Sequence, residues 1–241
     1  MVTQTFSVED LSAANRFLAG KSPQEILRWA VEVFHPRLTM ATAFGAEGCC
    51  LIHMVAEIEP AVHIFNLETG YQFPETLELR ERIKDRYGIE VVFVRPETTV
   101  AEYEALHGGP LYVTSPDRCC HDRKVVPLRR AVAGYAAWIS AIRRDQTIHR
   151  AAADLVQWDP KFGLIKVNPL LPWTKRDVWD FIVKNDVPYN PLHDEGYPSI
   201  GCWPCTRPVG DGENDRAGRW SDSQKKECGL HILEHQGGSG I

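Results

Sequence analysis

Two closely spaced cysteine pairs constrain this chain of 241 residues more than any other feature. Cys202 and Cys205 form a Cys-x-x-Cys unit, and Cys119 and Cys120 are adjacent far upstream. Four soft thiolates select zinc or an iron–sulfur cluster over hard cations. Adjacent side chains diverge in regular backbone and reach a single ion awkwardly, whereas a cube of several irons offers each sulfur its own iron. The spacing therefore favours a [4Fe-4S] cluster over zinc.

The same cysteines also have simpler interpretations. An adjacent pair such as Cys119 and Cys120 is often just two small buried residues on a helix. A Cys-x-x-Cys unit by itself is also the pattern of a redox dithiol. Both pairs occur in one chain, each flanked by turn formers or basic residues, and this combination favours the ligand interpretation.

A further cysteine, Cys228, lies near the end of the chain beside Lys225 and Lys226, whose charges favour thiolate formation. The stretch before it is polar and contains glycine, so it cannot pack independently. We therefore expect an α/β nucleotide-binding domain over residues 1–206 and a mobile tail over residues 207–241 that carries a nucleophilic Cys228. A disordered terminus with an incidental cysteine is the alternative.

Composition indicates the class of protein and the compartment in which it works. The chain is 44% hydrophobic and 24% charged, which is typical of a globular domain. Its seven cysteines follow no disulfide spacing, and neither a signal peptide nor a membrane-spanning run is visible. We therefore expect a cytoplasmic protein with no membrane association. The net charge of −5 argues against nucleic-acid binding. The oligomeric state stays open, and a homo-oligomer is compatible with the sequence.

Short apolar runs alternate with amphipathic stretches along most of the chain. This alternation predicts βαβ units and an α/β fold with a mainly parallel sheet and helices on both faces. Ligands on such sheets bind at the carboxyl ends of the strands, near a switch in strand order. The expected strands cover residues 38–43, 62–67, 90–94 and 136–142, and the expected helices follow Ser7 and Ser22 and cover 51–58, 74–87 and 174–183.

Two loops follow the first two expected strands. Residues 42–48 include Thr42, Phe44 and Gly45, and a small turn entering a helix presents free N–H groups that suit a phosphate or sulfate. A simple turn without a ligand is the alternative. The second loop, residues 66–71, is interpreted equally well as a capping loop.

Basic residues lie where an anionic ligand would need them. Lys124 follows Cys120 by four residues and falls on the same helical face. Arg143 and Arg144 stand at the end of the strand expected over 136–142, where guanidinium groups bind oxyanions bidentately. Solvated surface charges are the alternative in each case.

Taken in chain order, these motifs resemble the sulfonucleotide reductases, and within them the assimilatory adenylyl-sulfate (APS) reductases of the iron–sulfur type. The resemblance covers the chain from about Thr42 to His231. It is carried by Thr-Ala-Phe-Gly-Ala-Glu from residue 42, Glu68-Thr69-Gly70, Cys119-Cys120-x-x-Arg123-Lys124, Trp138-Ile139-Ser140-x-x-Arg143-Arg144-x-Gln146, Asn168-Pro169-Leu170, Gly201-Cys202-x-x-Cys205-Thr206 and Glu227-Cys228-Gly229-Leu230-His231.

The resemblance implies an adenine nucleotide α-hydrolase-like (PP-loop-like) fold and one [4Fe-4S] cluster per chain, held by Cys119, Cys120, Cys202 and Cys205. It implies that Cys228 attacks the sulfur of APS and releases AMP, and that thioredoxin or a similar dithiol then releases sulfite, in sulfate assimilation for cysteine biosynthesis. The positions that match the family's substrate contacts are Lys124, Arg143, Arg144, Arg216, Arg219 and His231, and the nucleotide loop contributes Thr42, Phe44 and Gly45.

The nucleotide loop departs from the family pattern at two places. Gly48 stands where a Ser or Asp is frequent, and Thr42-Ala43 stand where paired serines are common in the branch that uses 3′-phosphoadenylyl sulfate (PAPS). Backbone N–H groups do not depend on side-chain identity, so the loop keeps its capacity to bind phosphate.

Three other functions stay open. The cluster cysteines favour APS as substrate, because dedicated PAPS reductases usually lack them, but PAPS or dual activity is compatible with the motifs. An iron–sulfur tRNA-thiolating enzyme would need a fuller glycine-rich pyrophosphate loop and a basic surface. A non-catalytic redox sensor would use the Cys228 tail as its switch.

Overall fold

A computed structural model describes residues 6–221, 223, 225 and 227–230. Its centre is a six-stranded sheet with the order β3-β2-β1-β4-β6-β5. Every neighbouring pair is parallel except β5 and β6, which form an antiparallel hairpin at one edge. The strands are β1 (Leu38–Thr42), β2 (His63–Leu67), β3 (Val92–Val94), β4 (Ala137–Ile139), β5 (Val156–Asp159) and β6 (Leu164–Val167).

Helices connect the strands, and several begin with the predicted caps. Ser7, Ser22 and Thr174 each form a capping box, and Gly88 ends α4 in the left-handed conformation, as the sequence indicates. The helices are α1 (Val8–Leu18), α2 (Pro23–Phe34), α3 (Ala46–Ile58), α4 (Pro74–Tyr87), α5 (Val100–His107), α6 (Leu111–Thr114), α7 (Pro116–Cys120), α8 (Val126–Ala131), α9 (Ile148–Ala151) and α10 (Lys175–Asn185).

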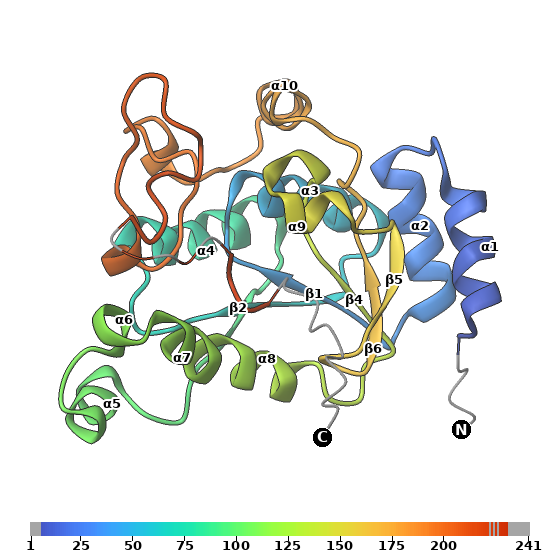
Figure 1. Cartoon of the computed structure of the whole chain (residues 1–241). Coiled ribbons are helices and arrows are strands. Elements are labelled where there is room, and N and C mark those ends of the chain that lie inside the picture. Colours follow the sequence, from blue (N-terminus) through green and yellow to red (C-terminus); the bar gives the residue numbers. More distant parts are fainter. Residues whose placement is uncertain (1–5, 222, 224, 226, 231–241) are drawn as a thin grey trace.

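Helices cover both faces of the sheet (Figure 1), and each face buries its own hydrophobic core. Because side chains alternate along a strand, Ile64 packs into the larger core beside α2, α3 and α10, while Phe65 packs into the smaller core beside α8. Ile139 and Trp138 divide between the two cores in the same way. The predicted parallel sheet with helices on both faces is confirmed.

The strand order reverses beside β1. The chain passes from β1 to β2 to β3 in one direction and then returns to place β4 on the other side of β1. The loops after β1 and β4 therefore diverge, which opens a crevice at the carboxyl ends of these two strands. The fold thus provides the ligand position that the strand pattern predicts.

The sequence reading missed or misplaced some elements. The β5–β6 hairpin was not predicted, and the strand expected over residues 136–142 ends at Ile139 because the chain turns away after Ser140 donates to the Val167 carbonyl. A π-helical turn, His121–Val125, joins α7 to α8 and was also not predicted. Among the described residues, no helix is both long and apolar enough to cross a bilayer.

The described part of the C-terminal segment folds back onto the Cys-x-x-Cys loop. Arg207 N donates to the Gly218 carbonyl at 2.9 Å, and Trp220 N donates to the Cys205 carbonyl at 3.0 Å. The Trp220 side chain is only 5% exposed. The division of the chain into a domain and a tail at residue 206 stays a prediction.

Candidate active site at the carboxyl ends of the strands

A cavity of about 320 Å³ lies at the reversal of strand order, where the ends of β1, β2 and β4 meet the loops that carry the cysteines. Six of the residues predicted to contact substrate line it, together with Cys202 and Cys228. These six residues are Thr42, Gly45, Lys124, Arg143, Arg216 and Arg219.

The loop after β1 is held open by its own hydrogen bond. Phe44 N donates to Thr42 Oγ1 at 3.0 Å, and Phe44 has a φ of 54°, so its ring turns into the larger core and is fully buried. Gly45 then caps α3 and lines the cavity. Thr42 and Gly45 thus face the cavity as predicted, whereas the Phe44 side chain faces the core.

The Cα of Gly48 lies directly against the Thr42 side chain. A Cβ atom at position 48 would lie 2.7 Å from Thr42 Oγ1, closer than a van der Waals contact allows. With the Thr42 hydroxyl in this position, a side chain at position 48 would require Thr42 to shift.

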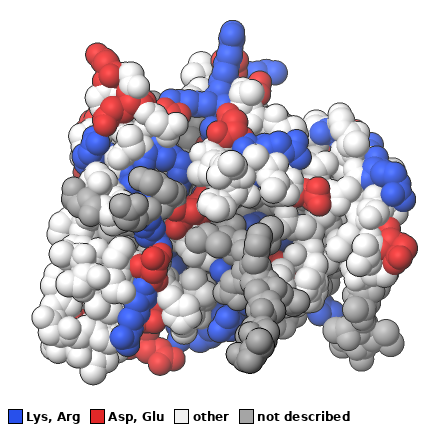
Figure 2. Space-filling model, viewed as in Figure 1, with Lys and Arg blue, Asp and Glu red and all other residues white. Residues whose placement is uncertain are grey.

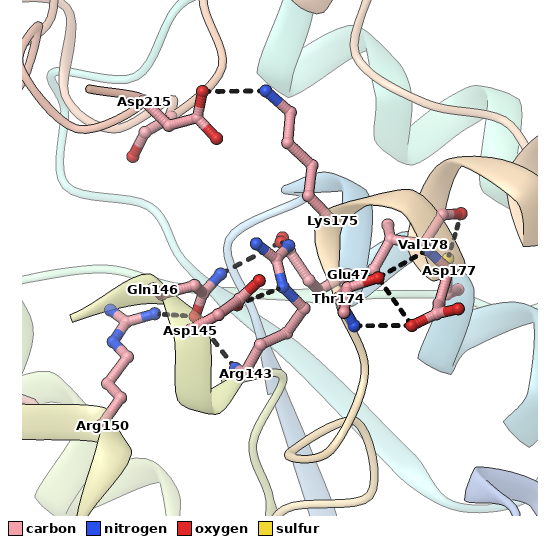
Figure 3. Close-up of polar contacts among 12 residues, drawn as sticks. Glu47, Arg143, Asp145, Gln146, Arg150, Thr174, Lys175, Asp177, Val178 and Asp215 are labelled. Carbon is pink, nitrogen blue, oxygen red and sulfur yellow. Dashed lines mark hydrogen bonds and ion pairs between the residues drawn. The ribbon is translucent and has the colours of Figure 1, made fainter. Parts of the chain in front are cut away.

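One end of the cavity is lined by a network of compensated charges (Figure 3). Arg143 pairs with Glu47 and, at 2.9 Å, with Asp145. Gln146 Nε2 donates to Glu47 Oε1 at 3.0 Å. The guanidinium of Arg143 is 7% exposed and already carries two carboxylate partners, so it shapes the cavity wall more readily than it clamps a phosphate.

Besides Phe44, one described residue that was predicted to contact substrate is not found in the cavity wall. Arg144 does not line the cavity: its backbone N–H donates to the Leu171 carbonyl, and its guanidinium lies 3.4 Å from the Ala153 carbonyl. Arg143 is in an extended conformation, whereas Arg144 begins a 3-10 turn, and of the two only Arg143 lines the cavity. His231 lies outside the described residues.

The other end of the cavity carries cations with unused donors. Arg216 Nε and Arg219 Nε are buried and, among the described residues, have no hydrogen-bond partner. Burial and the charges of neighbouring arginines lower the pKa of Arg216 to about 10, against the opposing charge of Glu227. Burial would lower the pKa of Lys124, but the charges of the surrounding cysteine sulfurs outweigh burial and raise it. Lys124 and Arg216 therefore remain charged beside the cavity at neutral pH.

The two cysteine pairs converge on a small pocket next to this cationic end, which Cys119, Cys120, Cys202 and Cys205 all line. The loop after β2 brings them together. Thr69 Oγ1 lies 3.3 Å from Cys202 Sγ, and the Thr69 carbonyl accepts a 2.6 Å hydrogen bond from Arg123 Nε, one turn beyond Cys120.

The surroundings of Cys119 and Cys120 favour the neutral forms of these two thiols when they hold no ligand. Burial, reinforced by the neighbouring Cys202 and Cys205 sulfurs, raises the pKa of Cys119 to about 11. The hydrogen bond with Cys228, followed by burial, raises the pKa of Cys120. Over residues 6–221 and the described positions beyond them, no three His, Cys, Asp or Glu side chains are grouped so as to hold one metal ion.

Cys228 lies between this pocket and the cavity. Its thiol is hydrogen-bonded to that of Cys120, and this bond, followed by the positive charges of Lys124 and Arg219, lowers the pKa of Cys228 against the opposing effect of burial. Cys228 is thus the sulfur of the group that both lines the cavity and is disposed to ionise.

Sequence reasoning did not single out two polar residues of the cavity wall. Asn66 Oδ1 at the end of β2 and Ser140 Oγ just after β4 are buried and, within the described part of the chain, lack hydrogen-bond partners. Both line the cavity. Their places at the carboxyl ends of adjacent parallel strands were a usable signal.

The sheet order and the position of the cavity define the class of this protein, an adenine nucleotide α-hydrolase-like α/β fold. Residues 37–208 match the family model described as "Phosphoadenosine phosphosulfate reductase domain". The chain belongs to the phosphoadenosine phosphosulfate reductase family.

Individual relatives agree with this assignment. The chain is 48% identical to a phosphoadenosine 5'-phosphosulfate reductase of Gloeobacter violaceus, over 87% of this chain and 88% of that protein. It is 44% identical to an adenosine 5'-phosphosulfate reductase of Bacillus pumilus, over 88% of this chain and 91% of that protein. A crystal structure of phosphoadenylyl-sulfate reductase from Candida auris superposes with a TM-score of 0.76 at 33% identity, over 84% of this chain and 98% of that one.

Proposed function

We propose that this protein is a thioredoxin-dependent APS reductase that forms sulfite and AMP through an S-sulfocysteine at Cys228. The observation that carries the proposal is the position of Cys228, which lines the cavity beside Lys124, Arg216 and Arg219. A nucleophile beside cations is the arrangement needed to attack a sulfur atom that carries anionic oxygens.

Different parts of the cavity wall suit different parts of APS. The unpaired oxygens of Asn66 and Ser140 offer hydrogen-bond acceptors to the amino and hydroxyl groups of adenosine. The N–H groups at the start of α3 and the free Nε donors of Arg216 and Arg219 suit the phosphosulfate. Figure 2 shows Lys and Arg interspersed with Asp and Glu on this face.

The chemistry consists of two displacements at sulfur. The Cys228 thiolate attacks the sulfuryl sulfur, the bond between sulfur and the bridging oxygen breaks, and AMP departs with the electron pair. A thioredoxin thiolate then attacks Cys228 Sγ, and sulfite departs with the electron pair of the S–S bond. The resulting mixed disulfide is resolved by the second thioredoxin thiol, so the two electrons come from the dithiol.

The donor set of the small pocket fits a [4Fe-4S] cluster. Four thiols line one pocket, and a cube presents a separate iron to each sulfur, so the ligands need not converge on one ion. Cys119, Cys120, Cys202 and Cys205 would hold it. When bound, the cluster would supply a fixed charge and cross-link the two cysteine loops. Lys124 lies between these sulfurs and Cys228, where its ammonium offsets negative charge.

The seven cysteines of the chain are all free thiols. Thiols persist in reducing compartments, where thioredoxin is also found. We infer a cytoplasmic setting on that basis.

The decisive test is a single turnover with APS and without thioredoxin, followed by peptide mass spectrometry. We expect one sulfonate group on the peptide that contains Cys228, no label in Cys228→Ser, and normal labelling in Cys49→Ala, whose thiol lies in the core. A sulfonate on another cysteine, or none at all with the iron content intact, would contradict the proposal.

PAPS is the second candidate substrate, because the Gloeobacter relative is named for it. Steady-state sulfite release should be compared for the two nucleotides on the same sample. We expect a higher kcat/KM with APS. The reverse preference would assign the protein to PAPS.

A further inference from the structure

Glu227, the residue before Cys228, is a carboxylate buried to 2% exposure. Arg150 Nε and Nη2 form a bidentate pair with its two oxygens at 2.9 and 3.0 Å. Thr147 Oγ1 donates to Oε2 at 3.1 Å, and Arg216 Nη2 lies 3.3 Å from Oε1. The carboxylate also accepts a 2.8 Å hydrogen bond from the Cys228 backbone N–H. The Glu227 side chain from the C-terminal segment therefore occupies a buried site formed by Arg150 of α9 and by Thr147, the N-cap of α9. We call this site the seat.

The residues after Cys228 are held as well. Lys161 Nζ, from the turn between β5 and β6, donates to the Gly229 carbonyl at 2.7 Å. Leu230 packs against the smaller core. Cys228 is thus flanked on both sides by contacts with the α/β body of the protein.

The seat is continuous with the cavity wall. Arg150 Nη1 donates to Gln146 Oε1, and Gln146 in turn donates to Glu47 on the loop after β1 (Figure 3). Arg216 contacts Glu227 through Nη2 while its Nε remains unpaired toward the cavity. Arg216 therefore serves both the Glu227 seat and the cationic end of the cavity.

We propose that Glu227 is a positioning residue, whose seat on Arg150, Thr147 and Arg216 holds the thiol of Cys228 at the cavity. Breaking a buried bidentate pair leaves an uncompensated charge. A short terminal segment relieves that charge by local release, at lower cost than unfolding of the sheet. The inference rests on the proposed function only in taking Cys228 as the nucleophile.

The test compares how readily Cys228 is alkylated with how fast it is sulfonated. In the iron-loaded protein without nucleotide, iodoacetamide should modify Cys228 at least tenfold faster in Glu227→Gln than in the unaltered chain. In the same variant, single-turnover sulfonation by APS should be at least tenfold slower. The matched control is Glu213→Gln, a carboxylate of the same segment whose partner Arg207 is exposed, and both of its rates should stay within twofold.

Further variants separate positioning from general damage to the fold. Arg150→Met should reproduce the Glu227→Gln phenotype, and Arg150→Lys should restore part of the protection. The double variant Arg150→Met with Glu227→Gln should be no worse than either single one, because neither member of the bidentate pair is left without the other. Glu227→Asp keeps the charge and serves if Glu227→Gln folds poorly.

Equal alkylation rates in Glu227→Gln and the unaltered chain would show that the contacts of Glu227 do not hold Cys228 in place, whatever the activity of the variant. Faster alkylation with unchanged sulfonation would overturn the positioning role. A Cys228 that is never sulfonated in any variant, but whose alkylation responds as expected, would instead contradict the proposed function and leave the seat standing.

Discussion

The C-terminal segment contains two parts that look alike in sequence and differ in how they are held. In the outer part, residues 207–215, the Arg207–Glu213 pair has side chains 44% and 37% exposed. In the inner part, residues 220–230, the Arg150–Glu227 pair has side chains 9% and 1% exposed. Both parts are polar, but the ion pair of the outer part is exposed to solvent and the ion pair of the inner part is buried.

The difference matters because solvent decides what an ion pair contributes. An exposed pair is screened and contributes from almost nothing to about 1 kcal/mol. Removing one partner of a buried pair costs about 3 to 5 kcal/mol, because it leaves a charge in a poorly solvated place. We expect the outer part to tolerate substitution and the inner part to govern the position of Cys228.

The largest effect on stability is expected from substituting two tryptophans. This pair compares a buried side chain with an exposed one and does not change any charge. Trp220 is 5% exposed and stacks beneath Arg219 and Lys225, whereas Trp203 is 50% exposed. We expect Trp220→Ala to lower the free energy of unfolding by about 3 kcal/mol or more and Trp203→Ala by less than about 1 kcal/mol. Chemical denaturation of the two variants measures this difference. Equal losses of unfolding free energy would show that Trp220 in the inner part contributes no more to stability than the exposed Trp203.

A second comparison sets Arg150→Met against Arg207→Met in amide hydrogen exchange. Local opening of the inner part should become easier by about 3 kcal/mol in Arg150→Met, which is a rise of roughly a hundredfold in exchange of residues 227–230. The exposed pair should change exchange of residues 207–215 by less than about fivefold. If the two variants respond equally, burial does not set the strength of the pairs.

Acid should release the inner part. Although burial favours the neutral acid, Arg150 and Arg216 hold the pKa of Glu227 below its ordinary value of 4.5. A carboxyl whose pKa is lowered in the seated state stabilises that state above its ordinary pKa, and the stabilisation is lost as pH falls through the lowered value. Lys166, whose pKa burial lowers to about 8, also faces Glu227 and stays protonated throughout this range.

The measurement is labelling of Cys228 by dithiodipyridine, which reacts with thiols in acid, while visible absorption follows the iron. Labelling should be flat from neutral pH down to about pH 5 and should rise below pH 4.5, the ordinary value for a glutamate. In Glu227→Gln it should be fast and independent of pH. A rise that persists in Glu227→Gln would point to acid unfolding instead.

The smallest effect is expected from Lys161→Met, which removes the single hydrogen bond to the Gly229 carbonyl. A net contribution of about 1 kcal/mol corresponds to roughly fivefold faster labelling of Cys228. Lys175→Met, which removes an exposed pair with Asp215, is the control and should leave labelling unchanged. A tenfold or larger effect of Lys161→Met would shift the main anchor from Glu227 to the hairpin turn.

Local patterns in the sequence were enough to predict the frame of the protein. Hydrophobic runs predicted the parallel strands, and Ser22 and Thr174 were recognisable as caps because a capping box spans only four residues. The sequence analysis treated the two cysteine pairs as one ligand set, since soft ligands at such spacing have few other uses, and the structure lines one pocket with all four. The holding of a cluster by these pairs stays a prediction.

Long-range pairing could not be predicted in this way. Arg150 and Glu227 are separated by 77 positions, and nothing local marks either as buried. Phe44 shows the same limit, because its positive φ turns the ring to the core while the loop around it remains at the cavity. Composition likewise treats residues 207–230 as uniformly polar and cannot separate their exposed part from their buried part.

The π-helical turn at His121–Val125 restricts how this protein can vary in length. The turn inserts one extra residue between the cysteine pair on α7 and the helix α8 that packs on the sheet. Because a π-turn absorbs one extra residue locally, deleting a single residue there would restore the α-helical repeat and leave Cys119 and Cys120 in their present orientation, whereas a deletion within α8 would rotate them by about 100° relative to the face of α8 that packs on the sheet. Homologous chains that keep both cysteine pairs are therefore expected to confine single-residue gaps between residues 119 and 131 to the turn at 121–125, while insertions accumulate in the exposed loop around residue 211.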